Sequence, residues 1–354
     1  MKTVRRLLAV SAALLGCAAP VASAASAPAP TPAPPGAQTS PAPPPPSPVV
    51  GRIKLVLQRV GGSPPFAFVG ARVVVRGIVW PYVGGQSAKV SFYREGRRVA
   101  VQTVSVQAIG NGAGQFHIGY SSGSPGLVEA RAVHYTTPQQ GEFSGRSPGV
   151  RYVQVNLGPG ASGQSVRLLQ SELDVLHYAV PLSGVFDEGT GRALIAYRKM
   201  VGLERVAYAG RQVFERLAHG AGSFHVLYPG DGRHVEADLT RQVLAEIEPG
   251  GRVRTLYTMS SGKPSTPTVI GRFNVYSKTP GVNGEGMVDS NYFVRGYAIH
   301  GYAEVPTFAA SHGCLRVPIP DAAAIYAWVR EGTQVDVYNE GGGGSNTVRR
   351  NAGP

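Results

Sequence analysis

The chain has 354 residues, with 34 Lys and Arg against 21 Asp and Glu and a formal net charge of +13. This length suffices for three domains that each bury a core, and two cysteines are too few for a disulfide-stapled scaffold. Because the first residues predict export, the basic charge favours attraction to envelope polymers and lipid headgroups, and we expect no nucleic-acid partner.

Residues 1–24 have the pattern of a secretory signal peptide. Cationic residues precede an apolar run at 7–15, and Ala22-Ser23-Ala24 offers a small-residue cleavage site. The segment Leu14-Leu15-Gly16-Cys17 also resembles a lipobox, in which case Cys17 would carry a lipid at the outer face of the membrane. We therefore expect an exported protein of the cell envelope, freely secreted or lipid-anchored, in which Cys314 is the free thiol.

Residues 25–50 are rich in Pro and Ala, a composition that favours an extended linker. The next predicted domain, residues 51–152, is an immunoglobulin-like β-sandwich, because short alternating or β-branched runs are separated by Gly, Pro, Ser and Asn clusters. Glu95-Gly96 predicts one of its hairpin turns. The strands are predicted at 54–60, 72–80, 89–93, 99–107, 115–120 and 127–134.

Residues 160–221 change to a helical period and predict a small three-helix domain. One apolar face consists of Val166, Leu169, Leu173 and Leu176. A second helix is expected to stop at Gly202 and a third before Gly220. The strings GQSVRLLQSEL, SGVFDEGTGRAL and VGL resemble the peptidoglycan-binding domain of wall hydrolases, which implies binding to glycan strands. The alternative is a helical linker domain that spaces the parts on either side.

Residues 224–339 predict a mainly-β domain with one C-terminal helix, which makes the whole chain multidomain and mainly β. Pro249-Gly250-Gly251 predicts a hairpin, and the helix is expected from Pro320 to Trp328 with Asp321 as its cap and Gly332 as its stop. Residues 340–354 predict a disordered tail. The strands are predicted at 235–239, 242–247, 252–259, 271–276, 292–299 and 334–338.

The stretch from His300 to Arg316, HGYAEVPTFAASHGCLR, carries the candidate site. A thiol is only slightly ionised at neutral pH, so Cys314 needs a neighbouring imidazole or a positive backbone field to act as a nucleophile. His312 shares a face with Cys314 if 311–316 is extended, and a loop can return His300 over the thiol. Gly313 lets backbone N–H groups approach an oxyanion. These residue types predict a cysteine acyltransferase.

The string SHGCLR with an upstream IHG resembles the signature of L,D-transpeptidases with YkuD-type catalytic domains, and the resemblance covers roughly 224–338. It implies Cys314 as the nucleophile, His300 as proton acceptor and donor, and the Gly301 carbonyl as the group that orients His300. It also implies an oxyanion and substrate site and an arginine that holds the donor carboxylate or supports the loop. These further residues are Ser311, His312, Gly313 and Arg316.

This resemblance implies peptidoglycan cross-linking through a Cys314 acyl-enzyme on tetrapeptide stems, with release of D-alanine and with carbapenem β-lactams as inhibitors. With water as the acceptor, the same site would be an L,D-carboxypeptidase. No metal or organic cofactor is required, although His300, His312 and Cys314 are also residue types that bind zinc. Papain-like enzymes are disfavoured because no histidine follows Cys314. A catalytically idle wall-binding protein is the remaining alternative.

Overall fold

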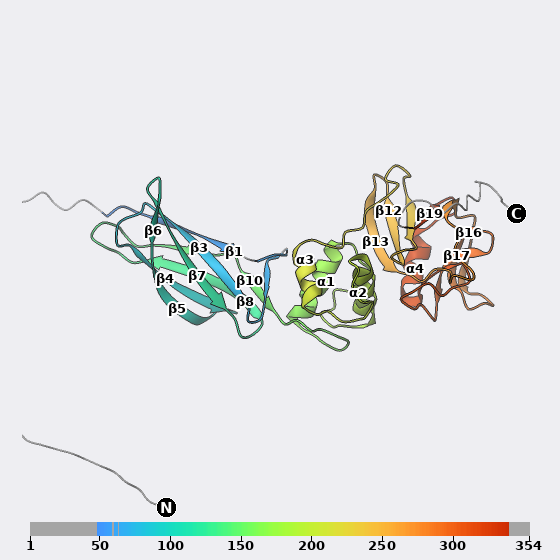
Figure 1. The fold of residues 1–354 in the computed structure, drawn as a ribbon, viewed down its shortest axis with the longest axis horizontal. Helices are drawn as coiled ribbons and strands as arrows, with labels where there is room; N and C mark the ends of the chain where they lie inside the picture. Colours follow the sequence, from blue (N-terminus) through green and yellow to red (C-terminus); the bar gives the residue numbers. More distant parts are fainter. Residues whose placement is uncertain (1–47, 59, 63, 340–354) are drawn as a thin grey trace, which may run out of the picture. The chain divides into compact units, whose positions relative to one another are not determined.

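The computed structural model describes residues 48–58, 60–62 and 64–339. The predicted signal peptide, the lipobox residue Cys17, most of the linker 25–50 and the predicted tail lie outside the described residues. The described part is mainly β with four helices, and Figure 1 shows their order along the chain. No helix among these residues is long and apolar enough to cross a membrane.

The first part of the described chain contains two sheets that share one apolar core. Their strand orders are β1-β3-β7-β6 and β2-β10-β8-β4-β5, with β9 paired to β8. Along β8 buried and half-buried residues alternate, as expected for a strand with one face on a core. The strands are β1 (Arg52–Gln58), β2 (Phe66–Phe68), β3 (Arg72–Trp80), β4 (Ser87–Arg94), β5 (Arg97–Ser105), β6 (Gln107–Gly110), β7 (Ala113–Ser121), β8 (Gly126–His134), β9 (Phe143–Arg146) and β10 (Val150–Val153).

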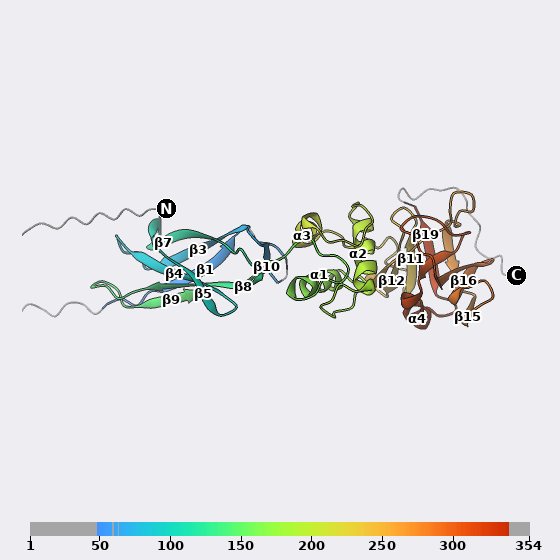
Figure 2. The ribbon, with the colours of Figure 1, turned by 90° about the horizontal axis from the view of Figure 1, so that it is seen from below.

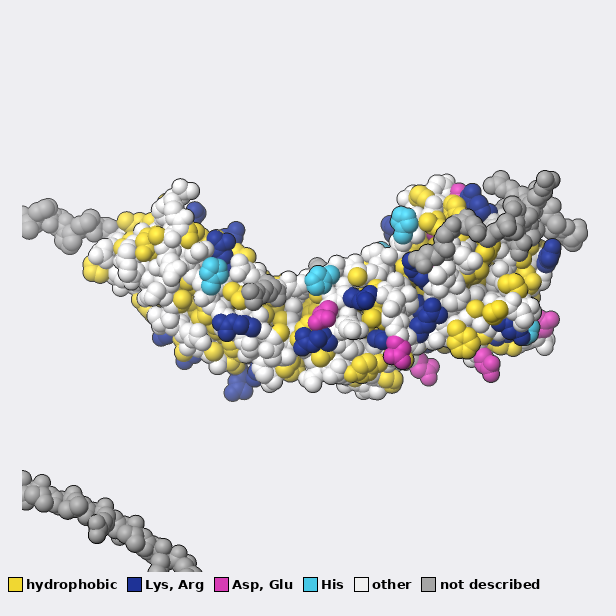
Figure 3. Space-filling model, viewed as in Figure 1, with side chains coloured by type: hydrophobic (Ala, Val, Ile, Leu, Met, Phe, Trp, Pro, Cys, Tyr) yellow, Lys and Arg dark blue, Asp and Glu magenta, His cyan; other side chains and the backbone are white. Residues whose placement is uncertain are grey.

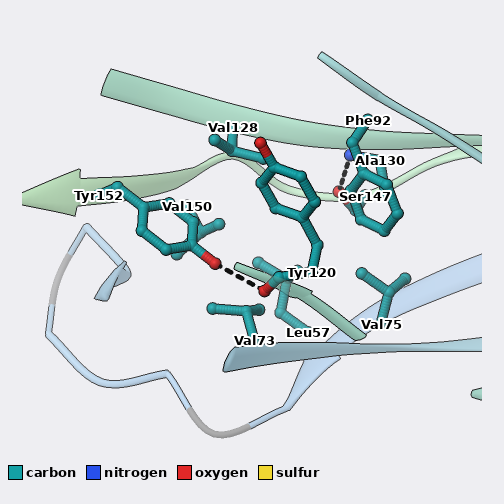
Figure 4. Close-up of a pocket in the computed structure, with 10 residues that line it drawn as sticks. All are labelled: Leu57, Val73, Val75, Phe92, Tyr120, Val128, Ala130, Ser147, Val150 and Tyr152. Carbon is teal, nitrogen blue, oxygen red and sulfur yellow. Dashed lines mark hydrogen bonds between the residues drawn. The ribbon is translucent and has the colours of Figure 1, made fainter. Parts of the chain in front are cut away.

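The interior of these two sheets is filled by their own side chains. A void of about 10 Å³ lies there, enough for one water molecule at most, and Figure 4 shows the side chains that line it. The Tyr152 hydroxyl beside it donates to the Tyr120 carbonyl at 2.9 Å, and the Ala130 amide donates to Ser147 Oγ at 2.9 Å. The interior therefore has no room for a ligand, and the immunoglobulin-like assignment stays a prediction.

The middle of the chain contains three short helices, which we call the helical module. They are α1 (Gln164–Val175), α2 (Glu188–Met200) and α3 (Arg211–Ala218). The Asp187 side chain caps α2 by accepting the Thr190 amide at 2.8 Å. Leu176, predicted on the apolar face of the first helix, is the C-cap residue that follows α1. The predicted stop after the third helix is confirmed, because Gly220 follows the C-cap residue His219 and has φ +69°.

The last part contains two further sheets and one helix. The first sheet has the order β13-β12-β11-β19-β14 and the second the order β15-β16-β17-β18. The elements are β11 (His234–Asp238), β12 (Val243–Glu248), β13 (Arg252–Thr258), β14 (Gly271–Asn274), β15 (Ser277–Val282), β16 (Val288–Val294), β17 (Tyr297–Tyr302), β18 (Leu315–Pro318), α4 (Ile319–Trp328) and β19 (Gln334–Tyr338). The predicted hairpin at Pro249-Gly250-Gly251 is confirmed between β12 and β13.

Three predictions for this part are wrong. The single strand at 292–299 is a hairpin, β16 and β17, because the chain turns at Arg295-Gly296, where Arg295 has φ +48°. Asp321 is not a cap: Pro318 occupies the N-cap position without a side-chain hydrogen bond, and Asp321 lies within the first turn. Gly332 is not the stop: the helix ends at Trp328, as predicted, with Val329 as its C-cap.

The helical module and the first of these sheets share a hydrophobic core. Figures 1 and 2 both show α2 beside β12 and β13. Leu169 and Leu173 of α1 belong to the same buried cluster as Ile247 of β12 and Leu256 of β13. The other face of the sheet packs in a second cluster that contains Ile325 of α4. The sheet therefore lies between two apolar layers.

Candidate active site

Two parallel strands bring the predicted histidine and cysteine together. The pairing of β17 with β18 sets His300 opposite Arg316, and Cys314 lies immediately before β18. The histidine is buried, with 2% of its surface exposed, and the cysteine is half-buried. The sequence predicted that a loop would return His300 to the thiol. In the structure His300 is returned by β17 and β18, the strands on either side of residues 303–314, which pair in parallel.

The His300 ring is held in one orientation by its neighbour. Its Nδ1 lies 2.9 Å from the Gly301 carbonyl oxygen. In the neutral ring Nδ1–H donates to this carbonyl, so Nε2 carries the lone pair that can accept a proton. Burial lowers the pKa of His300, and the charge of Arg316 lowers it further. The imidazole is therefore neutral at neutral pH.

The Cys314 thiol is also held in its neutral form. Burial raises its pKa above the ordinary value of 9.0, although Arg316 acts in the opposite direction. The thiol lies 3.8 Å from the Gly296 carbonyl oxygen, which can accept its weak hydrogen bond. A protonated thiol is a weak nucleophile, so this cysteine needs a base such as His300 at the moment of attack.

Hydroxyl groups fix the backbone directly before the cysteine. Ser311 Oγ donates to the Cys314 carbonyl at 2.6 Å and accepts the Gly313 amide at 3.1 Å. Thr268 Oγ1 donates to the Gly313 carbonyl at 2.8 Å, and Thr266 Oγ1 donates to the Ser311 carbonyl at 3.0 Å. The Gly313 amide, expected in the oxyanion site, is thus occupied by Ser311 in this conformation.

The condition that 311–316 is extended, on which the shared face of His312 and Cys314 depended, is not met in its first half. Gly313 has φ +120°, and a Cβ there would lie 2.4 Å from the Tyr297 ring, so the chain bends at a position that requires glycine. His312 is exposed as a result, and its Nε2 lies 3.3 Å from Lys263 Nζ. Its predicted place in the oxyanion site stays a prediction.

Arg316 lies on an aromatic ring. Its guanidinium is 4.0 Å from the centre of the Tyr302 ring, a distance at which a cation–π interaction is favourable. Its backbone pairs with Ser260 through two hydrogen bonds of 2.9 Å. The structure therefore gives Arg316 a part in supporting the loop, and its predicted contact with a donor carboxylate stays a prediction.

The segment 260–268 supports the site, and sequence reasoning assigned its residues no role. The carbonyl of Ser261 accepts the amides of Ala310 at 2.8 Å and Ser311 at 2.9 Å. The string SSGKPSTPT is rich in hydroxyl side chains, and this composition was the available signal. The residues that segment 260–268 contacts lie more than 40 positions away in the chain, so these contacts can be recognised only in the folded structure.

Within 48–58, 60–62 and 64–339, no group of three or more His, Cys, Asp and Glu side chains is arranged to hold a metal ion. His300, His312 and Cys314 are therefore not such a group.

Comparison with known proteins identifies the family. The model of the YkuD family, the L,D-transpeptidase catalytic domain, matches residues 232–337. An L,D-transpeptidase from Xylanimonas cellulosilytica is 31% identical over 52% of this chain and 98% of its own, with a TM-score of 0.48. No curated protein matches the chain. The family-model match identifies residues 232–337 as a YkuD L,D-transpeptidase catalytic domain.

Other solved L,D-transpeptidases are more distant. One from Stackebrandtia nassauensis is 22% identical over 53% of this chain and 97% of its own, with a TM-score of 0.35. One in complex with imipenem is 12% identical over 80% of this chain and 97% of its own, with a TM-score of 0.26. The YkuD domain supports an acyltransferase or peptidase type of enzyme and a role in peptidoglycan cross-linking.

Proposed function

We propose that the chain is an exported L,D-transpeptidase that cross-links peptidoglycan through an acyl-enzyme on Cys314. The observation that carries the proposal is the pairing of β17 with β18, which sets the buried His300 opposite Arg316, two residues from Cys314. Hydrogen bonding to Gly301 leaves Nε2 of His300 as the proton acceptor. A positioned base and a lone thiol are the two groups that nucleophilic acyl transfer needs.

In the first half of the proposed reaction, Cys314 attacks the carbonyl carbon of the third residue of a tetrapeptide stem. The thiol proton passes to His300 Nε2 as the sulfur–carbon bond forms. The tetrahedral intermediate then breaks its carbon–nitrogen bond, and His300 returns the proton to the departing D-alanine. A thioester between the stem and Cys314 results.

In the second half an amine from a second stem attacks the thioester. His300 takes one of its protons and transfers it to the leaving sulfur, so that a new amide forms and the thiol is restored. Water in place of the amine would give carboxypeptidase action. Because the same imidazole serves both halves, the acceptor that reaches the thioester decides which product forms.

Export and the partners of the enzyme belong to the same proposal. The signal-peptide pattern in 1–24 places the enzyme in the cell envelope, tethered there if Cys17 is lipidated. Its partners would be the stem peptides and glycan strands of peptidoglycan, to which a basic protein is attracted. Carbapenems are the expected inhibitors, as one similar L,D-transpeptidase was solved in complex with imipenem.

The test is to incubate the purified protein with tetrapeptide-bearing muropeptides and to identify the products by mass spectrometry. We expect cross-linked dimers with release of D-alanine, and neither product from Cys314→Ala. Tripeptide monomers without dimers would assign carboxypeptidase action instead. Intact substrate with the parent protein, or dimers with the variant, would overturn the proposal.

A further inference from the structure

The helical module covers an edge of the sheet β13-β12-β11-β19-β14. Strand β13 is the outer strand of that sheet, and the segment 177–179 pairs with it: the Ala179 amide donates to the Leu256 carbonyl at 3.0 Å, and the Leu256 amide donates to the His177 carbonyl at 2.8 Å. Together with the shared core, this pairing protects an edge that would otherwise be open.

Three cations of the helical module reach three different segments around the site. Arg192 binds the Asp321 carboxylate with two hydrogen bonds of 3.1 and 3.0 Å in the first turn of α4. Arg205 donates to the carbonyl of Thr307, which lies in the loop between His300 and Cys314. Lys199 reaches the end of β13. Together these contacts connect α2 and the segment after it to the surroundings of the thiol.

Lys199 is the most buried of the three, with 4% of its surface exposed. Its ammonium donates to Thr258 Oγ1 at 2.7 Å, to the Met259 carbonyl at 2.8 Å and to the Gln242 carbonyl at 2.9 Å. An ammonium group has three donors, so all of them are used. Burial lowers the pKa of Lys199 to about 7, and these three hydrogen bonds favour the charged form, so the ammonium holds the three acceptors in one place.

The residues that follow Met259 carry this restraint to the nucleophile. Ser260 pairs with Arg316 on one side of Cys314, and its Oγ donates to the Phe308 carbonyl at 2.7 Å. Ser261 accepts the amides of Ala310 and Ser311 on the other side. The residues at the end of β13, where Lys199 binds, therefore hold the backbone on both sides of Cys314.

We propose that the helical module is a structural part of the active site and that Lys199 is a positioning residue for Cys314. Its effect on catalysis rests on the proposed function, whereas its effect on the backbone does not. Without the ammonium, the acceptors at the end of β13 lose their common partner and segments 258–264 and 308–316 loosen together. A misplaced nucleophile reacts more slowly even when the protein remains folded.

The test compares Lys199→Met with Arg198→Met in the full chain. Arg198 is the matched control, because it is also a buried cation of α2, but it donates to the carbonyls of Glu204 and Tyr208 within the helical module. Amide hydrogen exchange measures backbone protection, and alkylation of Cys314 by iodoacetamide at several pH values measures thiol reactivity. Neither readout requires transpeptidase activity.

For Lys199→Met we expect faster exchange in 258–264 and 308–316 and a thiol alkylation rate changed by at least about 3-fold. We also expect D-alanine release at least about 10-fold slower, with the KM of the donor nearly unchanged. Arg198→Met should exchange faster within 188–218 and leave the thiol unaffected. Equal effects of the two variants on the thiol, or unchanged exchange in Lys199→Met, would overturn the proposal.

If Lys199→Met does not fold, the variant Arg205→Gln tests the structural role of the helical module through a different contact with the surroundings of the site. This variant removes one contact to Thr307 from a half-buried side chain, and it should increase exchange in 303–310 and slow D-alanine release. Unchanged exchange there would contradict a structural role of the module. If the variants show the expected changes in amide exchange but the parent protein forms no transpeptidase product, the result would count against the proposed function alone.

Discussion

At the scale of single residues, burial keeps both proposed reacting groups neutral. Burial lowers the pKa of His300 and raises the pKa of Cys314, so the resting site does not contain a thiolate–imidazolium ion pair. Arg316 disfavours the protonated imidazole and favours the thiolate, but burial has the larger effect on both groups. The thiol must therefore lose its proton to His300 during attack, which makes the rate depend on the neutral imidazole.

This arrangement predicts the pH dependence of kcat/KM for the tetrapeptide donor. Because the pKa of His300 lies below its ordinary value of 6.5, the rate should stay constant as pH falls to about that value and decline only below it. The measurement is D-alanine release between about pH 5 and pH 9. A decline that is already complete between about pH 8 and pH 7 would contradict a base with a lowered pKa.

A second prediction at this scale concerns Gly301. A Cβ added there would lie 2.8 Å from the Ala322 Cβ and 3.2 Å from the Ile319 Cα, so α4 leaves no space for it. We expect Gly301→Ala to lower the free energy of unfolding by about 1–3 kcal/mol, as overpacking does. Gly296→Ala in the same hairpin is the control, since its Cβ would meet nothing within 4 Å. Equal stability of the two variants in urea unfolding would contradict this packing.

At the scale of elements, strong local patterns were predicted well and long-range pairings were not. The strand from Arg72 to Trp80 was predicted to the residue, because its alternation is regular and its ends are polar or aromatic. The Glu95-Gly96 turn is confirmed, with φ +47° and +77° between β4 and β5. Strands β2, β9 and β10 were missed, because three or four residues are too few to show a period.

The errors near the site have a physical cause of the same kind. Asp321 has the sequence position of a helix cap, but its carboxylate binds Arg192, a residue 129 positions earlier in the chain. The bend at Gly313 depends on the Tyr297 ring, which packs where a Cβ would lie. Sequence patterns identified His300 and Cys314 as a pair, whereas the loop that supports them depends on tertiary contacts.

At the scale of the whole molecule, the basic charge should govern attraction to the cell wall. On the face shown in Figure 3, Lys and Arg side chains are scattered and do not gather in one patch. Arg192 and Lys199 of the helical module are used in contacts with the catalytic part. This leaves general charge attraction as the main expected source of affinity for anionic wall polymers.

The corresponding prediction is that binding of the full chain to purified peptidoglycan weakens as salt is added. Attraction between exposed charges is screened within about 8 Å at physiological ionic strength and within about 3 Å at 1 M salt. Co-sedimentation over this range of salt measures the effect. Binding that is unchanged at 1 M salt would instead support the predicted glycan-binding role of residues 160–221.

The most direct test of the central claim is the mass of the protein during reaction with a tetrapeptide donor. We expect one stem peptide, without its terminal D-alanine, to be attached to Cys314, and peptide mapping to place it on that residue. The adduct should disappear when an acceptor amine is added and should not form in Cys314→Ala. D-alanine release by the Cys314→Ala protein, or a covalent adduct on another residue, would contradict the account.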